Sequence, residues 1–324
     1  MKAIGGYFGL ADYEEGGTFP HQGGILLNTG RNALEYILRS IGEVKHLYLP
    51  YYTCEVVLEP VEKLGIPYTF YHTNLQLEIE GDIEPQQGEY IIANNYYGIK
   101  DGYIQQLAKR YGSQLIVDCA QAFFAKPIPG IKCFYSTRKY VGVADGGVAF
   151  LSVSPDGLVD VNGTDHSAEH DSHLLKRKQF GAEAGFSDFQ ANETKLDNQP
   201  IRWMSDDTKR ILNHIDYDKV VALRRENFQY LHHALACCNR LKLPSMNSFE
   251  CPMVYPFMTG KDSGLRKKLI ENKVFVAKYW PNVVLKESFE LENELANCVI
   301  PLPSDQRYGT EEMDRIIEIV RGEA

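Results

Sequence analysis

Strand-like and helix-like segments alternate along the first half of this 324-residue chain. Period-two or apolar runs predict strands at 46–49, 67–71, 90–94 and 115–118. Amphipathic runs between them predict helices at 53–64 and 102–111. Such alternation is typical of a mainly parallel sheet with helices on both faces. Ligands of such folds bind beyond the carboxyl ends of the strands. The sequence therefore predicts an α/β fold whose site lies where these strands end.

Two chemically useful side chains follow predicted strands. One apolar strand ends at Asp118, and a second, Cys133 to Tyr135, is followed by a polar loop that carries Lys139. A lysine in water, with a pKa of about 10.4, is almost entirely ammonium and is not nucleophilic. A loop framed by buried strands can keep the amine partly dry. Together these residues predict pyridoxal 5'-phosphate (PLP), with its aldehyde on Lys139 and its protonated pyridine nitrogen beside Asp118.

Each signal has a simpler reading. A lysine after a strand is usually a surface residue, and an acid at a strand end often binds metal or ribose. A helix is predicted to begin near Arg31, just after Gly30. A glycine at a helix start lets the backbone approach an anion, such as the cofactor's phosphate, although a plain helix capped by Asn28 or Thr29 also explains it.

The segments around these residues resemble the DegT/DnrJ-type family of sugar aminotransferases, which are PLP-dependent enzymes of fold type I. The matching motifs are Asp118-Cys119-Ala120-Gln121-Ala122, Ser136-Thr137-Arg138-Lys139 followed by Asp145-Gly146-Gly147, and Leu302-Pro303-Ser304-Asp305-Gln306-Arg307-Tyr308. The resemblance covers most of the chain in order. It implies a mainly parallel sheet of the seven-stranded type, flanked by helices, and a smaller C-terminal α+β domain.

The resemblance also implies site residues. Lys139 is the expected catalytic residue, and the expected cofactor contacts are Gly30, Arg31, Asn32, Cys54, Asn95, Asp118, Gln121 and Ser136. Gln121 is expected near the ring hydroxyl, and Ser136 with the helix start is expected at the phosphate. Cys54 stands where many relatives have an aromatic residue that stacks on the cofactor. We therefore expect Tyr51, Tyr52 or another side chain to supply the stacking.

The predicted reaction moves an amino group from an amino acid, glutamate by resemblance, to a keto sugar or a related small carbonyl compound. The family's nucleotide sugars of polysaccharide biosynthesis are one such acceptor. Arg138, Arg307 and Tyr52 are candidate substrate contacts, because the fork of arginine fits a carboxylate or phosphate. A salt bridge is an equally good reading of either arginine.

Two other functions remain open. A PLP-dependent dehydration is disfavoured because relatives that dehydrate carry a histidine in place of Lys139. A non-catalytic binding protein is disfavoured because Lys139, Asp118 and Gln121 are all present.

The composition of the chain indicates which kinds of binding partner and which cellular compartment to expect. A net charge of −9 without a long basic run argues against nucleic acid. The chain has no apolar run of about 20 residues and no signal peptide, so we expect no membrane span or secretion. Seven cysteines without a C-x-x-C motif predict buried free thiols in a reducing cytosol. We expect a cytoplasmic protein and, by resemblance, a homodimer.

Domain organisation follows from the same patterns. Residues 1–212 are predicted to form the large cofactor-binding domain and residues 213–324 the small one. Residues 1–24 are expected to be an irregular arm, and 152–204 a polar covering segment. In that segment, a helix would place His166, His170 and His173 on one face, where they could bind zinc. A solvated loop explains these histidines more simply, so no metal is expected.

Overall fold

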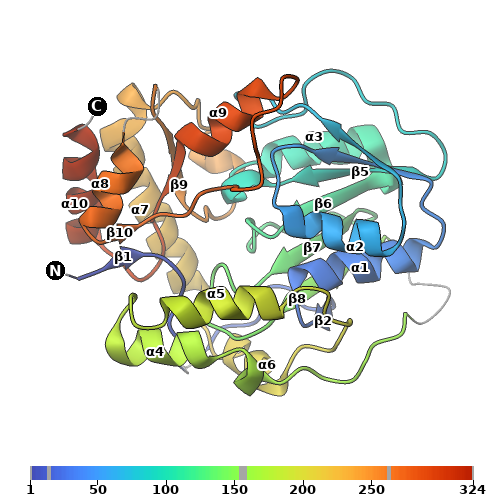
Figure 1. Cartoon of the computed structure of the whole chain (residues 1–324), viewed down its shortest axis with the longest axis horizontal. Helices are drawn as coiled ribbons and strands as arrows, with labels where there is room; N and C mark the ends of the chain where they lie inside the picture. Colours follow the sequence, from blue (N-terminus) through green and yellow to red (C-terminus); the bar gives the residue numbers. More distant parts are fainter. Residues whose placement is uncertain (1, 13–15, 153–158, 261–263, 323–324) are drawn as a thin grey trace.

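A computed structural model describes residues 2–12, 16–152, 159–260 and 264–322 (Figure 1). Its centre is a seven-stranded sheet. In spatial order the strands are β2 (Ile25–Leu27), β8 (Gly147–Phe150), β7 (Lys132–Ser136), β6 (Leu115–Cys119), β5 (Glu89–Asn94), β3 (His46–Pro50) and β4 (Tyr68–Tyr71). Strand β8 is antiparallel to both of its neighbours, and all other pairs are parallel. The prediction of a mainly parallel α/β sheet is confirmed.

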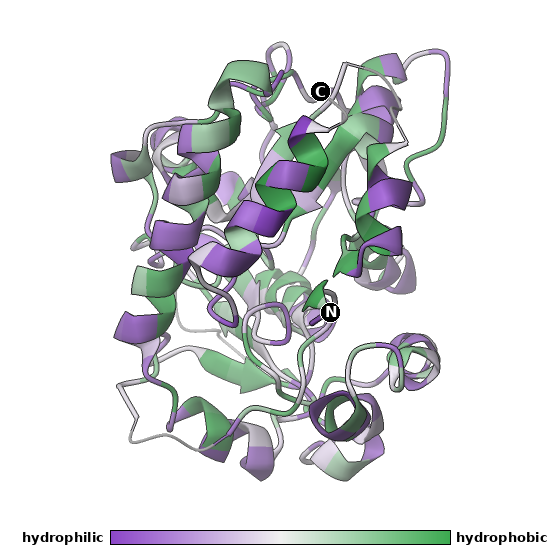
Figure 2. Cartoon of the chain, turned by 90° about the vertical axis from the view of Figure 1, so that its left-hand side faces the viewer, coloured by the Kyte–Doolittle hydropathy of each residue, from purple (hydrophilic) through white to green (hydrophobic). Residues whose placement is uncertain are grey.

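The two faces of the sheet bury different clusters. Ile116 of β6 faces the cluster under α1 (Gly30–Ile41) and α2 (Leu58–Lys63). Val117 faces the larger cluster, which contains residues of α3 (Asp101–Tyr111) and of the C-terminal part. Strands buried on both faces explain the continuous apolar runs in the sequence. Figure 2 shows these apolar strands inside, with helices of mixed polarity around them.

Helix α1 illustrates how local sequence sets an element. Thr29 caps it by accepting a hydrogen bond from the Asn32 amide, and Gly42, at φ 82°, ends it. Ile37 and Leu38 are buried against the sheet. The helix therefore starts at the carboxyl edge of the sheet, where the site was predicted.

The C-terminal part combines helices with short strands. Strands β9 (Tyr255–Met258) and β11 (Val299–Leu302) pair antiparallel. The helices are α7 (Tyr217–Leu235), α8 (Leu265–Glu271), α9 (Glu290–Cys298) and α10 (Thr310–Arg321). Strand β1 (Ile4–Gly5) pairs parallel with β10 (Val274–Phe275), so the N-terminal arm, expected to be irregular, is tied to the C-terminal part (Figure 1). The domain boundary near residue 212 stays a prediction.

The segment 152–204, expected to be a polar covering segment, contains two helices, α4 (Ser172–Phe180) and α5 (Phe186–Lys195). Helix α6 (Asp206–Leu212) follows, capped by Ser205. The alternative in which His166, His170 and His173 share a helix face is not formed, because only His173 lies in α4. The favoured solvated loop does not hold for His170 and His173 either, since both are buried. Short 3₁₀ turns lie at Glu55–Val57, Tyr96–Gly98, Gly112–Gln114, Ser167–Glu169, Ala236–Cys238 and Met246–Ser248.

None of the helices in the described residues is long and apolar enough to cross a membrane. All seven cysteines are free thiols, as predicted. Cys237 and Cys238 are exposed, because they lie in the turn that follows α7 rather than in the core.

Candidate active site

Three polar side chains meet at the carboxyl edge of the sheet, below the start of α1. Asn94 of β5 lies beside Asp118 of β6, and Ser136 ends β7. Asp118 alternates with Ile116, which packs under α1, so its side chain faces α1 as well. The strand ends therefore bring an amide, a carboxylate and a hydroxyl to one edge of the sheet.

Asp118 is 8% exposed. Burial raises the pKa of its carboxyl, while the nearby charge of Lys139 and a hydrogen bond from the Ala120 amide to Oδ1 (2.8 Å) oppose that shift. A buried carboxylate without a bound cation is costly. The position therefore suits a positively charged partner, which is what a protonated pyridine nitrogen would supply.

Lys139 lies on the loop after β7 and is half-buried. Its loop is fixed by hydrogen bonds from the Thr137 amide to Gly146 O (3.2 Å) and from Thr137 Oγ1 to Asp145 O (3.1 Å). Among the described residues, none forms a hydrogen bond or ion pair with the Lys139 amine. The backbone that carries Lys139 is thus fixed, while its side-chain amine is available to a ligand.

The Asp145-Gly146-Gly147 motif lets the lysine loop approach α1. Gly146 has φ 127°, which disfavours any other residue. A Cβ on Gly147 would lie 2.1 Å from Thr29 O, so no side chain fits there. Gly30 in turn lies against Ser136, since a Cβ added to Gly30 would be 3.5 Å from Ser136 Cβ. The glycines therefore bring the helix start to the Ser136 hydroxyl.

The helix start offers donors to an anion. The Asn32 amide is taken by Thr29, and the Asn32 side chain donates to Gln199 O (3.0 Å). Neither the Gly30 nor the Arg31 backbone amide donates to another described residue. These two amides, the Ser136 hydroxyl and the positive end of the helix dipole can together hold a phosphate. In this arrangement Asn32 supports the helix start with its side chain.

Gln121 offers a hydrogen-bond donor of the right kind. Its Oε1 accepts from the Tyr97 amide (3.0 Å), but its Nε2 is buried and has no partner among the described residues. A buried donor without an acceptor costs about 1–3 kcal/mol, so such groups usually meet a ligand or water. A ring hydroxyl oxygen would satisfy it. With Lys139, Asp118 and the helix start, the residues present fit PLP.

Asn95, predicted to contact the cofactor, points elsewhere. Its Nδ2 donates to Asp101 Oδ1 (2.5 Å), and its Oδ1 accepts from the Lys100 amide (3.0 Å), so it braces the start of α3. The neighbouring Asn94 has a buried Oδ1 without a partner in the described residues, while its Nδ2 donates to Thr53 Oγ1 (2.9 Å). Sequence reasoning missed Asn94, although the alternation of side chains along β5 could have found it.

Cys54 lies near Lys139 and Asp118. Burial raises the pKa of its thiol, and the charges of Lys139 and Asp118 both act on it. Tyr51 stacks on Phe289 at 4.0 Å between ring centroids, and Tyr52 is fully buried. Both tyrosines predicted to stack on the cofactor are therefore packed against protein.

The three predicted substrate contacts all have partners within the chain. Arg138 pairs with Glu193 (2.6 Å), and Arg307 pairs with Asp305 (2.7 Å). The Tyr52 hydroxyl bonds to that of Tyr97 at 2.7 Å. Their assignment to substrate stays a prediction. Arg31 is similarly paired, with Glu59 (2.6 Å) and Asp197 (2.7 Å), which leaves its backbone amide as its contribution to an anion.

One cluster in the described residues has metal-ligating types. Ligand atoms of Asp165, Glu169 and His170 lie within 4.8 Å of one another. Arg202 pairs with Asp165 at 3.2 Å, and its positive charge competes with a cation there. An internal ion-pair network accounts for the cluster, and the absence of a metal stays a prediction.

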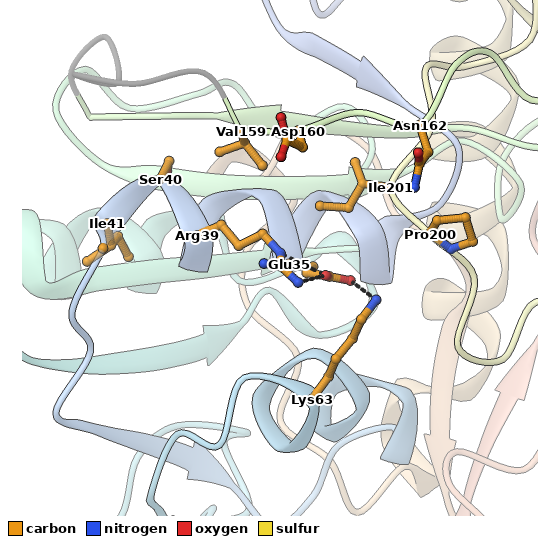
Figure 3. A pocket seen from close by; sticks show the side chains of 11 residues that line it. Glu35, Arg39, Ser40, Ile41, Lys63, Val159, Asp160, Asn162, Pro200 and Ile201 are labelled. Carbon is orange, nitrogen blue, oxygen red and sulfur yellow. Dashed lines mark hydrogen bonds and ion pairs between the residues drawn. The ribbon is translucent and has the colours of Figure 1, made fainter.

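A surface cavity of about 740 Å³ lies on another side of α1, between α2 and residues 159–201 (Figure 3). Glu35 lies at its base and bridges Arg39 and Lys63. None of the predicted site residues lines it. The candidate active site is therefore separate from this cavity.

Comparison with known proteins shows the fold. No protein-family model matches the chain, and no curated protein sequence matches it. Solved structures do match, at sequence identities of 13–16%. The chain shares its fold with them, and they include the sugar aminotransferase CalS13 and the putative sugar aminotransferase Spr1654.

Three of these structures indicate the extent of the match. DesV from S. venezuelae, in complex with a ketimine intermediate, is 16% identical, with 92% of this chain and 84% of DesV covered and a TM-score of 0.66. The putative sugar aminotransferase Spr1654 from Streptococcus pneumoniae, in its apo-form, is 14% identical over 98% and 92%, with a TM-score of 0.65. The aminotransferase TlmJ from Streptoalloteichus hindustanus is 13% identical over 99% and 98%, with a TM-score of 0.65.

Proposed function

We propose that this chain is a PLP-dependent aminotransferase of the DegT/DnrJ type. The observation that carries the proposal is the charge of Lys139 acting on the buried Asp118 carboxylate, and the unpartnered Nε2 of Gln121, three residues after Asp118, supports it. These three functions match an aldehyde, a ring nitrogen and a ring hydroxyl. The shared fold supports the proposal, since Spr1654 has been solved in PLP and PMP forms.

The residues would act in distinct ways. PLP, when bound, supplies an electron sink for the carbanion that forms at the donor's α-carbon. Lys139 would hold the aldehyde and, after the donor displaces it, its Nζ would accept the proton from that α-carbon. Asp118 would keep the ring nitrogen protonated, and Gln121 Nε2 would donate to the ring oxygen.

We infer further that the acceptor is a keto sugar or a related carbonyl compound, with glutamate as donor. The structures of the sugar aminotransferase CalS13 and of the putative sugar aminotransferase Spr1654 support this class and leave the nucleotide sugar as a finer proposal. Cytoplasmic location is likewise proposed from the free thiols.

A homodimer is proposed on the resemblance and on the exposed aromatic side chains near α4 and α5. Phe180 is 72% exposed and Phe186 52% exposed, which is unusual for large apolar side chains. Light scattering should give twice the chain mass. A measured mass that stays equal to that of one chain at high protein concentration would contradict the dimer.

The test of function is the spectrum of the purified protein with PLP. Wild type should show a visible imine band that amino donors remove, and Lys139→Ala should lack the band. Lys126→Ala, a change at an exposed lysine paired with Glu250, is the matched control and should behave as wild type.

Product analysis separates the alternatives. Transfer of nitrogen from glutamate to a keto sugar supports the proposal, and loss of water from the sugar without amino transfer would favour dehydration. If wild type binds PLP but its spectrum does not respond to any amino donor, the chain is a binding protein and the proposal fails.

A further inference from the structure

Tyr140, the residue after Lys139, is fixed at three points. Its hydroxyl donates to Gln121 O (2.7 Å), and its carbonyl accepts from Gln306 Nε2 (2.8 Å). Its ring lies under the Arg224 guanidinium, 4.4 Å from the ring centroid. The peptide that carries Lys139 is therefore attached both to another predicted cofactor contact and to the C-terminal part.

Gln121 is held from a second side. Its Oε1 accepts from the Tyr97 amide, and Tyr97 O accepts from the Met253 amide (2.8 Å). Tyr97 has φ 57°, a conformation that non-glycine residues adopt only when their surroundings impose it. That conformation belongs to the turn that presents its amide to Gln121. The orientation of the Gln121 side chain thus depends on the segment around Met253.

Arg224 joins the two paths. Its Nε donates to Gln306 Oε1 (2.7 Å), and its Nη1 donates to Met253 O (2.9 Å). The contacts therefore form a closed ring of six residues: Arg224, Gln306, Tyr140, Gln121, Tyr97 and Met253. Lys139 directly precedes one member of this ring, Tyr140, and the unpartnered Nε2 belongs to its neighbour in the ring, Gln121.

Arg224 is fully buried, and no carboxylate of the described residues forms an ion pair with it. A buried cation is costly unless its donors are satisfied. Here Nε and Nη1 donate to an amide oxygen and to carbonyl oxygens, and the guanidinium lies over an aromatic face, a set that a lysine could not contact together. Nη2 is buried and has no hydrogen-bond partner among the described residues. Such a residue does more than fill space, since an apolar side chain would fill it at lower cost.

We propose that Arg224 and Gln306 are positioning residues for the amino transfer, an inference that rests on the function proposed above. They fix the Lys139 peptide relative to Gln121, so that the Lys139 amine and the Gln121 Nε2 donor can both contact the PLP ring at a fixed distance from each other. Neither residue touches the cofactor. Their effect passes through Tyr140 on one side and through Met253 and Tyr97 on the other.

The test uses Gln306→Glu in the full chain. A glutamate keeps the acceptor for Arg224 Nε but has no donor for the Tyr140 carbonyl, so it breaks the ring at one link. Displacement of a catalytic group by about 1 Å can cost on the order of 10²-fold in rate. We expect kcat to fall by about that factor at saturating PLP, with little change in the KM of the donor.

Arg225→Gln is the matched control. Arg225 is the next residue of α7, and its guanidinium also binds carbonyl oxygens, those of Met246, Phe249 and Glu250, but it has no link to Tyr140. It should keep the wild-type kcat. Arg224→Lys should lower kcat as Gln306→Glu does, because one ammonium cannot contact Gln306 and Met253 together.

A second readout does not need the cofactor. Hydrogen exchange of the peptide containing residues 137–146 should be faster in PLP-free Gln306→Glu than in PLP-free wild type or Arg225→Gln. If Gln306→Glu matches Arg225→Gln in both kcat and exchange, positioning is overturned while the aminotransferase proposal stands. If wild type neither binds PLP nor transfers nitrogen, the function falls and this inference falls with it.

Discussion

Asp118 combines burial, a raised pKa and a position beside Lys139. For a carboxyl whose pKa is raised by folding, the folded chain binds the proton more tightly than the unfolded chain does. The ionised form therefore lowers stability as pH rises from about 3.9, the ordinary value, through the raised pKa. Below that range the cost disappears.

This gives a prediction at the residue scale for Asp118→Asn. Without PLP, the variant should have a higher melting temperature than wild type at neutral pH, because asparagine carries no buried charge. The difference should shrink as pH falls below the raised pKa. With PLP, amino transfer should drop on the order of 10²-fold or more, because a charge that stabilises the reacting ring is lost.

Thermal melts from pH 3 to pH 8 and rate measurements check both parts. Asp207→Asn, at an exposed acid of α6, serves as the control. A variant that is less stable than wild type at neutral pH would show that Asp118 is not under the strain inferred from its burial.

Sequence reasoning found the residues whose chemistry is rare in their setting. An acid at the end of an apolar strand, a lysine between two strands and a glutamine three residues after the acid stand out against apolar neighbours. It could not tell Asn94 from Asn95, because a turn begins there and the direction of each side chain depends on hydrogen bonds to Thr53 and Asp101. The acids that pair with Arg31 and Arg138 come from a distant segment and leave no local pattern.

At the scale of elements, the site depends on how closely the start of α1 approaches the loop after β7. Gly147 makes this approach possible, because its missing side chain leaves room for Thr29 O. The Gly146 amide also donates to Asn28 O. The start of α1 and the loop after β7 are therefore in direct backbone contact, with no side chain between them.

We predict that Gly147→Ala lowers the free energy of unfolding by about 1–3 kcal/mol, the usual cost of overpacking. The added methyl group should push α1 away from Ser136 and weaken the affinity for PLP. Urea unfolding and PLP titration measure the two effects.

Gly309→Ala is the matched control, because nothing lies within 4 Å of its Cβ position and its φ is −126°. Because alanine is a poorer N-cap than glycine, it should cost no more than about 1 kcal/mol. Equal losses in the two variants would mean that the lost flexibility of glycine, and not the close approach, sets the cost.

Elements with a strong apolar period were predicted close to their observed bounds, as in α3 and the start of α1. Helices α4 and α5 were missed because they lie over the surface with few buried positions: only His173 and Leu174 of α4, and Asn192 of α5, are buried. Helix α9 and strand β11 were also missed. The helix is rich in acids, and the strand that follows it directly contains Pro301.

At the scale of the molecule, α9 attaches the C-terminal part to the sheet. Glu292 is 1% exposed and accepts from the Thr73 amide (2.7 Å) and from His72 Nδ1 (3.2 Å). Phe289 stacks on both His72 and Tyr51. The contact fixes the loop after β3, which carries Cys54, against the C-terminal part.

Glu292→Ala should therefore lower the free energy of unfolding by about 1–3 kcal/mol, because it leaves the buried Thr73 amide without an acceptor. Hydrogen exchange should increase at residues 71–73. Glu290→Ala removes an exposed acid from the same turn of α9 and should change neither quantity by a comparable amount. Unchanged exchange at Thr73 in Glu292→Ala would show that another contact holds the two parts together.

The pairing of β1 with β10 affects how the molecule can form. Ile4 pairs with Val274, and the residues that follow lie against α4 and the lysine loop, through bonds from Leu10 to Leu174 and from Ala11 to Gly142. Ile4 and Val274 are far apart in the sequence, so a long stretch of chain must be closed into a loop before they pair, and that closure costs entropy. The loop that carries Lys139 thus gains part of its support from a contact between distant segments, which makes formation of the site a slow, long-range step of folding.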